Sequence, residues 1–149
     1  MKWIIVLLLG TGFFLYRKNA PLHVQVAGPA LKEFSTSDQC AGKKSCLLVY
    51  VAPWCPACHS MTPAFKLWKD KSVNSDCGVK IIVGKERTQG DNEVMAQKFG
   101  EGVIIDSSLS IHDSLPIEGY PTILLVQNGS VEKKAQDAFN WANQKLLLP

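Results

Sequence analysis

The segment at residues 47–51 constrains the fold of this chain more than any other. Its sequence, Leu-Leu-Val-Tyr-Val, is an uninterrupted apolar run rich in β-branched and aromatic side chains. Such a run, without polar alternation, predicts a β-strand that is buried on both faces. A strand covered on both faces belongs to a sheet flanked by helices, so we expect an α/β domain around it.

The residues after this run alternate between helix and strand patterns. Pro56 suits a first helical position, and Met61, Phe65 and Trp68 recur at spacings typical of one helix face. Asn128-Gly129 is a pair preferred in two-residue hairpin turns. The other expected elements are strands at 79–83, 103–105, 122–126 and from 131, a helix at 91–99 capped by Asp91, a loop at 107–117, and a final helix with an inward stripe of Ala135, Ala138, Phe139, Ala142 and Leu146.

This order of elements predicts a central mixed sheet flanked by helices. Strands joined through a helix run parallel, whereas the two strands of a hairpin run antiparallel. The chain has 149 residues, which is the usual size of one domain. We therefore expect one α/β core at residues 31–149.

The N-terminus has the composition of a membrane or export segment. Residues 3–16 carry no charge and are bounded by Lys2 and by Arg17-Lys18. As a helix they span only about 21 Å, less than the roughly 30 Å of a bilayer core, so a signal peptide is one interpretation. No small-x-small cleavage site follows directly, which favours an uncleaved anchor. We assign residues 1–18 to the anchor or signal segment and 19–30 to a linker.

The charge pattern argues against a nucleic-acid partner. The net charge is only +3, and charged residues make up 19% of the chain. Lys43-Lys44 and Lys133-Lys134 are isolated pairs and form no basic run. Such pairs are typical of solvated surface, so we expect no binding to nucleic acid.

Cys55 and Cys58 lie at the predicted transition from the apolar strand to the following helix. A thiolate attacks a disulfide, and the amides and dipole at a helix N-terminus stabilise that anion. Cys58, one turn later, can resolve the resulting mixed disulfide, so the pair predicts thiol-disulfide exchange without a dissociable cofactor. Trp54 is either an apolar flank of the thiol or a half-buried aromatic at the strand end. The residues expected to tune the centre are Pro56, Ala57 and His59, the last with a plain exposed histidine as the alternative.

These motifs resemble the thioredoxin superfamily over roughly residues 31–147. The resemblance is carried by Trp54-Cys55-Pro56-Ala57-Cys58, Pro63, Gly119-Tyr120-Pro121-Thr122 and Asn128-Gly129, in that order and approximate spacing. The segment before Pro121 is most similar to membrane-anchored TlpA- and ResA-like extracytoplasmic thiol-disulfide oxidoreductases. The resemblance implies that Pro121 is cis and faces the cysteines, and that the Tyr120 backbone pairs with an extended substrate. It also implies protein thiols and disulfides as substrates, a redox-recycling partner, and a reductase, for example in cytochrome c maturation.

Two positions depart from the pattern of these relatives. Many carry an acid or amide six residues before the first cysteine, where this chain has Val49. ResA-like reductases often carry glutamate three residues after the second cysteine, where it has Met61. A buried proton acceptor for Cys58 is therefore missing from both places. The direction of exchange stays open, because Pro56 and His59 favour a more oxidising centre and the resemblance favours reduction.

Three other functions remain open at this point. Cys55-Pro56-Ala57-Cys58-His59 also matches the c-type haem attachment motif, with Met61 or Met95 as axial ligands. Zinc held by the four cysteines at 40, 46, 55 and 58 is a weaker alternative because its ligand spacing is unusual. A binding or chaperone domain without turnover is a third, although such a domain would be expected to lose a cysteine or Pro121. His23 and His112 are left unassigned.

The remaining cysteines bear on the compartment. Cys40 and Cys46 are separated by five residues of a polar loop, where a disulfide or two free thiols are both compatible with the sequence. A disulfide there would persist only in an oxidising compartment, which favours a periplasmic or other extracytoplasmic domain. The nearly balanced charges around residues 3–16 instead slightly favour a domain on the cytoplasmic side of the membrane. Cys77, before Gly78, is expected to be structural.

Overall fold

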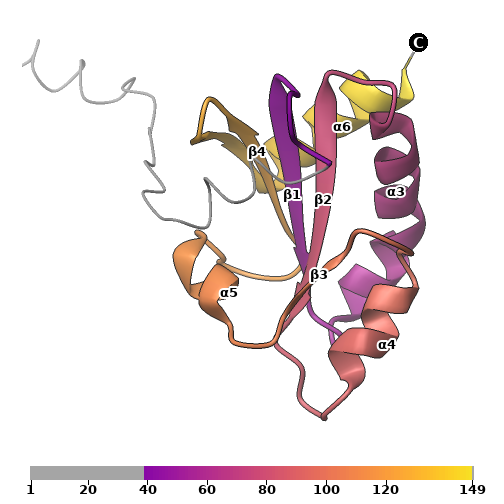
Figure 1. Cartoon of the computed structure of the whole chain (residues 1–149), viewed down its shortest axis with the longest axis vertical. Coiled ribbons are helices and arrows are strands. Elements are labelled where there is room, and N and C mark those ends of the chain that lie inside the picture. Colours follow the sequence, from indigo (N-terminus) through magenta and orange to yellow (C-terminus); the bar gives the residue numbers. More distant parts are fainter. Residues whose placement is uncertain (1–38, 149) are drawn as a thin grey trace, which may run out of the picture.

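A five-stranded mixed sheet organises residues 39–148, the part of the chain that this computed structural model describes (Figure 1). The central strand pairs in parallel with one neighbour and antiparallel with the other. This is the predicted mixed sheet flanked by helices. In spatial order the strands are β3 (Ile104–Asp106), β2 (Cys77–Gly84), β1 (Ser45–Val51), β4 (Thr122–Gln127) and β5 (Ser130–Lys134).

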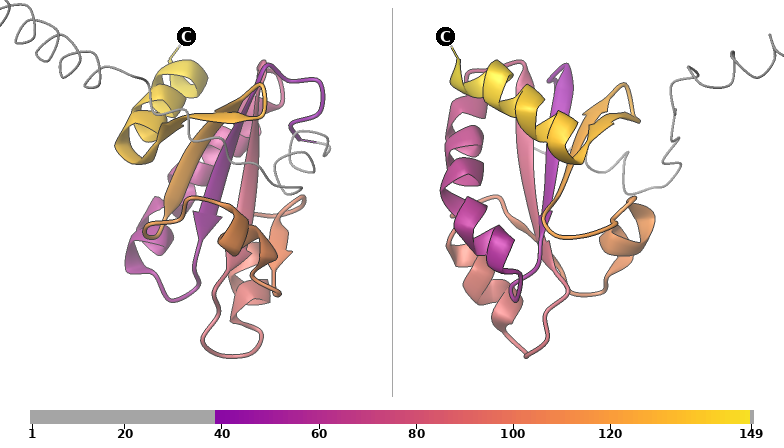
Figure 2. Two further views of the ribbon diagram at one scale, coloured as in Figure 1. Left: turned by 90° about the vertical axis from the view of Figure 1, so that its left-hand side faces the viewer. Right: turned by 180° about the vertical axis from the view of Figure 1, so that it is seen from behind.

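Helices cover both faces of this sheet (Figure 2). One face packs against the three longer helices, which share a core with the odd-numbered residues of β1. The opposite face packs against the short helix α5 and holds the even-numbered residues of β1. The helices are α3 (Pro56–Ser72), α4 (Asp91–Gln97), α5 (Ser110–Ser114) and α6 (Ala135–Ala142), which continues into the π-helical turn η1 (Asn143–Leu147).

Burial confirms why residues 47–51 specify the centre of the fold. Every residue of β1 is buried, as expected for a strand with helices on both sides. Phe65 and Trp68 of α3 are fully buried and Met61 packs against the same core, which confirms the predicted helix face. Burying a side chain of this size contributes roughly 1.5–3 kcal/mol each, so this face of α3 holds the helix on the sheet.

Three local predictions were wrong. Asp91 is not the cap of α4, because Gly90 takes that place with a φ of 90° and the Glu86 carboxylate accepts hydrogen bonds from the amides of Gly90 and Asn92. Residues 107–117 are not wholly loop, since Asp106 accepts the amides of Ile111 and His112 and so starts α5. Ala135 is exposed with a φ of 51°, so the inward stripe of α6 begins at Ala138.

The predicted hairpin is confirmed. Gln127 pairs with Ser130, which leaves Asn128 and Gly129 as the two turn residues between β4 and β5. Both have positive φ values, 50° and 76°. That is the conformation for which an Asn-Gly pair is preferred.

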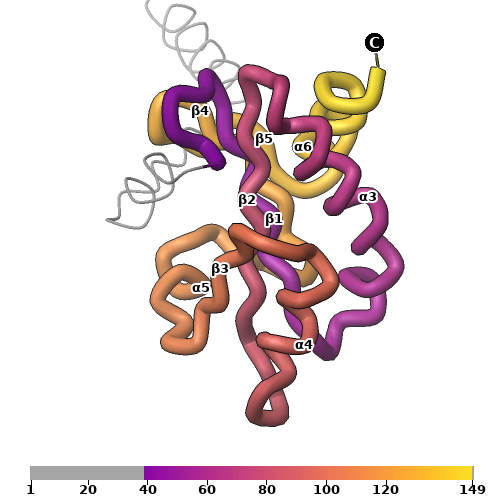
Figure 3. Tube along the Cα trace, turned by 45° about the vertical axis from the view of Figure 1, so that its right-hand side comes forward, coloured from indigo at the N-terminus to yellow at the C-terminus, as the bar shows by residue number. Residues whose placement is uncertain are grey.

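A disulfide between Cys40 and Cys46 closes the loop that leads into β1, which agrees with the disulfide interpretation of this pair. Figures 1 and 3 place this loop at one end of the sheet and the start of α3 at the other. Lys43, within the loop, donates hydrogen bonds from Nζ to the carbonyls of Ser72 and Val73, both at 3.1 Å, and of Ser75. The loop thereby supplies hydrogen bonds to carbonyls at and just after the C-terminal end of α3.

Cys77 is a free and fully buried thiol in β2. It lies in the core on the helix α3 side of the sheet, whereas Cys46 lies in the core on the opposite side. Its Sγ donates a hydrogen bond to the Gly78 carbonyl, and burial raises the pKa of the thiol. These contacts agree with a structural role for Cys77.

Candidate active site

The central strand leads to Cys55 at the N-cap of a helix. After β1, the Cys55 amide donates to the Ala52 carbonyl at 3.1 Å and the chain turns. Cys55 is the N-cap of α3, with extended backbone angles, and Pro56 begins the helix. Pro56 suits this position because its missing N–H would be unpaired there in any case. The predicted strand-to-helix transition at the cysteine pair is confirmed.

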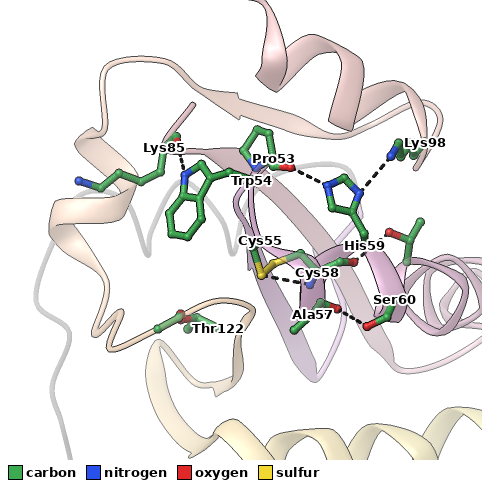
Figure 4. The surroundings of a disulfide bond; sticks show 12 residues. Pro53, Trp54, Cys55, Ala57, Cys58, His59, Ser60, Lys85, Lys98 and Thr122 are labelled. Carbon is green, nitrogen blue, oxygen red and sulfur yellow. Dashed lines mark hydrogen bonds between the residues drawn. A yellow bond between two sulfur atoms is a disulfide. The ribbon is translucent and has the colours of Figure 1, made fainter. Parts of the chain in front are cut away.

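Cys55 and Cys58 form a disulfide across the first turn of α3, with their Cα atoms 5.2 Å apart (Figure 4). The Cys58 amide donates to the Cys55 Sγ at 3.1 Å. Cys55 is 3% exposed, whereas Cys58 is completely buried. The little exposure that the pair has therefore lies at Cys55, as expected if Cys55 is the attacking cysteine and Cys58 the resolving one.

The peptide bond between Tyr120 and Pro121 is cis, as the resemblance implied. Tyr120 packs against the core cluster that contains both cysteines, and Figure 4 shows Thr122 beside the disulfide. Thr122 donates from its hydroxyl to the Gly119 carbonyl at 2.5 Å, which braces the turn before the cis bond. A hollow of about 330 Å³ lies along this loop and is lined by residues that include Tyr120, Pro121 and Thr122.

Trp54 joins the cysteine pair to two other loops. Its Nε1 donates to the Lys85 carbonyl at 2.6 Å, and its ring meets the Tyr120 ring edge-on with centroids 5.3 Å apart. The Arg87 guanidinium lies 4.0 Å from the Trp54 ring centroid. The Trp54 side chain remains 37% exposed, so it forms part of the surface next to Cys55.

His59 points toward the loop before Cys55 (Figure 4). Its Nε2 lies 2.6 Å from the Pro53 carbonyl oxygen, and its Nδ1 lies 3.0 Å from Lys98 Nζ. Because an ammonium group only donates, Nδ1 accepts from Lys98 and Nε2 carries the hydrogen that Pro53 accepts. His59 thus fastens the start of α3 to the loop that carries Trp54 and Cys55.

The buried side of the cysteine pair is apolar. Val49 is fully buried and Met61 partly buried, and both belong to the cluster around Cys58. The only buried carboxylate among residues 39–148 is Asp106, which accepts a hydrogen bond from Tyr50 in the core on the other sheet face. The absence of an acid at the two expected positions is therefore not compensated by another buried carboxylate in this region.

The structure reveals a polar network that the sequence analysis missed. Tyr50 donates to Asp106 at 2.9 Å, and Asp106 in turn anchors α5. His112 of α5 bonds the Tyr120 hydroxyl through Nε2 at 2.8 Å and the Asp113 carboxylate through Nδ1 at 2.9 Å. Burial, reinforced by Asp106, raises the pKa of Tyr50, and burial also raises the pKa of Tyr120.

This network reaches the residue immediately before the cis-proline. No sequence signal indicated it, because Tyr50 and Asp106 lie 56 positions apart and His112 stood alone in an expected loop. Gly84 makes room for it, since a side chain there would overlap the Tyr50 hydroxyl. Tyr120 is thus held from one side by His112 and touched from the other by Trp54.

The residues present do not fit zinc or a covalently attached haem. The Cys40–Cys46 and Cys55–Cys58 pairs are each closed as disulfides and do not converge. Within the described part of the chain, no three His, Cys, Asp or Glu side chains are grouped to hold a metal. Haem attachment needs both sulfurs at the porphyrin edge, but Cys58 is buried and both His59 nitrogens are already bonded to Pro53 and Lys98.

Several solved structures are similar to this chain. The thioredoxin domain of a thiol-disulfide oxidoreductase from Bacteroides vulgatus has a TM-score of 0.56 at 18% identity, covering 70% of this chain and 81% of that one. The exposed lipoprotein thioredoxin Etrx1 from Streptococcus pneumoniae has a TM-score of 0.57 at 19% identity, covering 78% and 90%. StoA from Bacillus subtilis has a TM-score of 0.50 at 24% identity, covering 63% and 73%.

Sequence comparison gives a weaker but compatible result. No family model matches the chain. Protein disulfide-isomerase from Oryctolagus cuniculus is 24% identical over 125 residues, which is 77% of this chain. The match spans only 20% of the length of that curated relative. The sheet order, the cis-proline and the structural matches together confirm the resemblance inferred from the motifs: this chain has the thioredoxin-like fold.

Proposed function

We propose that this chain is a thiol-disulfide oxidoreductase that exchanges disulfides with partner proteins through Cys55 and Cys58. The observation that carries the proposal is the Cys55–Cys58 disulfide across the first turn of α3, with Cys55 at the N-cap of the helix and beside a cis-proline loop. The names of the similar proteins, which include thiol-disulfide oxidoreductases and a disulfide isomerase, support it. Trp54, Tyr120 and Pro121 are proposed to bind the partner chain.

In the reducing direction the Cys55 thiolate attacks a partner disulfide. A bond forms between Cys55 and one partner sulfur, and the other partner sulfur leaves as a thiolate and takes a proton. The Cys58 thiolate then attacks the Cys55 sulfur and releases the second partner thiol. Two electrons and two protons have passed to the partner, and the Cys55–Cys58 disulfide remains. A dithiol reductant returns it to the starting state, and the same steps in reverse oxidise a partner.

The helix start favours the first of these steps. The Cys58 amide points at the Cys55 sulfur from 3.1 Å, and the first turn of α3 contains no acidic residue. Both features stabilise a thiolate at Cys55, because unpaired amides and the helix dipole present positive charge there. Burial leaves Cys58 shielded until Cys55 is engaged in a mixed disulfide.

We further propose that residues 1–18 anchor the domain at a membrane and that residues 19–30 form a linker. The domain then lies on the extracytoplasmic side of the membrane and acts there as a reductase. The anchor prediction lies outside the described residues, and within 39–148 no helix is sufficiently long and apolar to cross a bilayer. The Cys40–Cys46 disulfide supports an oxidising compartment. The TlpA- and ResA-like resemblance supports the reducing direction.

Two measurements test the proposed function. Titration of the full-length chain against a glutathione buffer gives the potential of the Cys55–Cys58 pair, and a value near roughly −270 mV, that of thioredoxin, supports a reductase. A much higher potential would reverse the proposed direction. The Cys58→Ser variant is expected to accumulate mixed disulfides with extracytoplasmic proteins, and complete failure to do so would overturn exchange with partner proteins.

A further inference from the structure

The surface around Cys55 carries positive charges that lack carboxylate partners. The Arg87 guanidinium covers Trp54, the residue directly before Cys55, and Lys85 belongs to the same loop as Arg87. Lys98 lies on the other flank, where it donates to His59. Within residues 39–148, none of these three cations forms an ion pair with an acidic side chain.

The acidic side chains of the neighbouring loops are already engaged. The Glu86 carboxylate accepts two backbone amides at 3.2 Å, and the Asp91 carboxylate accepts the Thr88 amide at 3.2 Å. Glu118, near the cis-proline, pairs with Lys134 at 2.8 Å. The segment at 52–59 contains no acidic residue at all. Glu86 and Asp91 keep their negative charge, because their partners are neutral amides, but both carboxylates are held in place. The side chains that remain available to pair with a partner next to Trp54 are therefore the cations Lys85 and Arg87.

Arg87 is held in a defined place. A guanidinium stacked on an indole ring loses part of its conformational freedom in advance, while its N–H groups at the edge stay available. Those N–H groups match the two oxygens of a carboxylate. The Trp54 ring is itself fixed by the Lys85 carbonyl and by Tyr120, so Arg87 keeps its position relative to the loop that carries Cys55.

We propose that Arg87 and Lys85 select partner proteins with acidic side chains next to the reacting cysteine. This proposal rests on the exchange activity proposed above and names its substrate class. An extended partner segment that reaches Cys55 beside Tyr120 passes the Trp54 ring, and a carboxylate within a few residues of its cysteine meets Arg87. Attraction of this kind raises the rate of encounter and orients the segment before sulfur exchange.

Matched peptides test the proposal on the reduced full-length chain. Each peptide contains one cysteine joined in a disulfide to 2-mercaptoethanol, flanked by glutamate in one peptide and by glutamine in the other. The second-order rate constant for loss of the mixed disulfide is measured for both. We expect the glutamate peptide to react about three- to fivefold faster at low salt. The ratio should fall toward one near 1 M salt, where charges are screened beyond roughly 3 Å.

Variants locate the effect. Arg87→Gln and Lys85→Gln should each lower the ratio, whereas Lys71→Gln should leave it unchanged. Lys71 is an exposed residue in the last turn of α3, at the far end of the helix from Cys55, so it controls for net charge. Because the ratio compares two peptides on one protein, an effect of Arg87 on the Cys55 thiolate cancels.

The outcomes separate this proposal from the proposed function. Reaction with neutral 2-hydroxyethyl disulfide shows that exchange occurs, and its absence would overturn the proposed function itself. Exchange with this compound but equal rates for the two peptides would overturn the acidic preference alone. An equal loss of preference in Lys71→Gln would assign the preference to overall charge and would likewise overturn the role of Arg87 and Lys85.

Discussion

The molecule carries two disulfides at the two ends of helix α3, and their surroundings differ in almost every respect. Cys55–Cys58 spans the first turn of the helix and lies beside the exposed Trp54 ring. Cys40–Cys46 closes a loop from which Lys43 holds the last carbonyls of the same helix. The first pair is placed where a thiolate is stabilised, and the second where a covalent link braces the fold.

The surroundings of the two pairs therefore differ, although both disulfides close short loops, with sequence separations of 6 and 3. A side chain at Gly78 would overlap Gln39 and the Cys40 sulfur, so Cys40 packs directly on β2. No equivalent strand packs on Pro56 and Ala57, which are exposed between Cys55 and Cys58. We expect the first pair to control activity and the second to control stability.

The largest expected effect is on activity. Cys55→Ser should abolish exchange with 2-hydroxyethyl disulfide, because serine is no nucleophile toward a disulfide sulfur. The rate of mixed-disulfide formation measured by mass spectrometry checks this. The double variant Cys40→Ala/Cys46→Ala is the matched control and should keep the wild-type rate. Residual exchange through Cys58 in Cys55→Ser would contradict the assignment of Cys55 as the attacking cysteine.

The same double variant should lose stability. Removing a disulfide that closes a short loop costs about 2 kcal/mol in the chain-entropy model. Denaturant unfolding of the oxidised wild type and of Cys40→Ala/Cys46→Ala measures the difference in free energy of unfolding. Reduction of Cys55–Cys58 alone, achieved in the double variant, should change stability less. A larger loss from that reduction would reverse the assignment of roles.

A smaller effect is expected at Lys43. Lys43→Met keeps most of the side-chain stem but removes the ammonium that binds three carbonyls at the end of α3, which should cost about 1 kcal/mol. Lys44→Met is the neighbouring control, because the Lys44 side chain is exposed and its ion pair with Asp76 is long, at 4.0 Å, and therefore weak. If thermal melting shifts equally in both variants, the hydrogen bonds of Lys43 are not the cause.

The smallest expected effect is on the pH dependence of stability, and it concerns Cys77, the cysteine that forms no disulfide. Burial raises the pKa of the Cys77 thiol above its ordinary value of 9.0. The unfolded state then loses this proton at lower pH than the folded state, so stability is unaffected well below pH 9 and falls as pH rises through and above it. The free energy of unfolding of Cys77→Ala should show a shallower decline over this range. Identical slopes for the two proteins would refute the assignment to Cys77.

The local parts of this structure could be predicted from the sequence, whereas contacts between distant segments could not. Residues 47–51, Pro56 and Asn128-Gly129 act through burial, fixed φ or turn conformation, which a short segment already determines. The cap of α4 was misassigned because Asp91 and Glu86 are both nearby acids, and only the path of the loop decides which one reaches the amides.

The candidate site shows the same division. The cysteine pair follows from its position between a strand and a helix, and the cis bond at Pro121 came only from family resemblance. The link from Tyr50 through Asp106 and α5 to Tyr120 joins three strands or loops that no periodic pattern connects. The contact between Arg87 and the Trp54 ring could not be predicted either, because it depends on how the loop after β2 approaches the cysteine pair.

The position of Cys77 gives the Cys40–Cys46 bond a consequence for assembly. In the native register Cys46 stands opposite Gly78, one residue beyond Cys77, so the two sulfurs face opposite sides of the sheet. A slip of one residue between β1 and β2 would turn Cys46 and Cys77 to the same side, where an oxidant could join them and trap the error. Closing Cys40 onto Cys46 removes that partner, so a Cys46–Cys77 bond could no longer trap the wrong register.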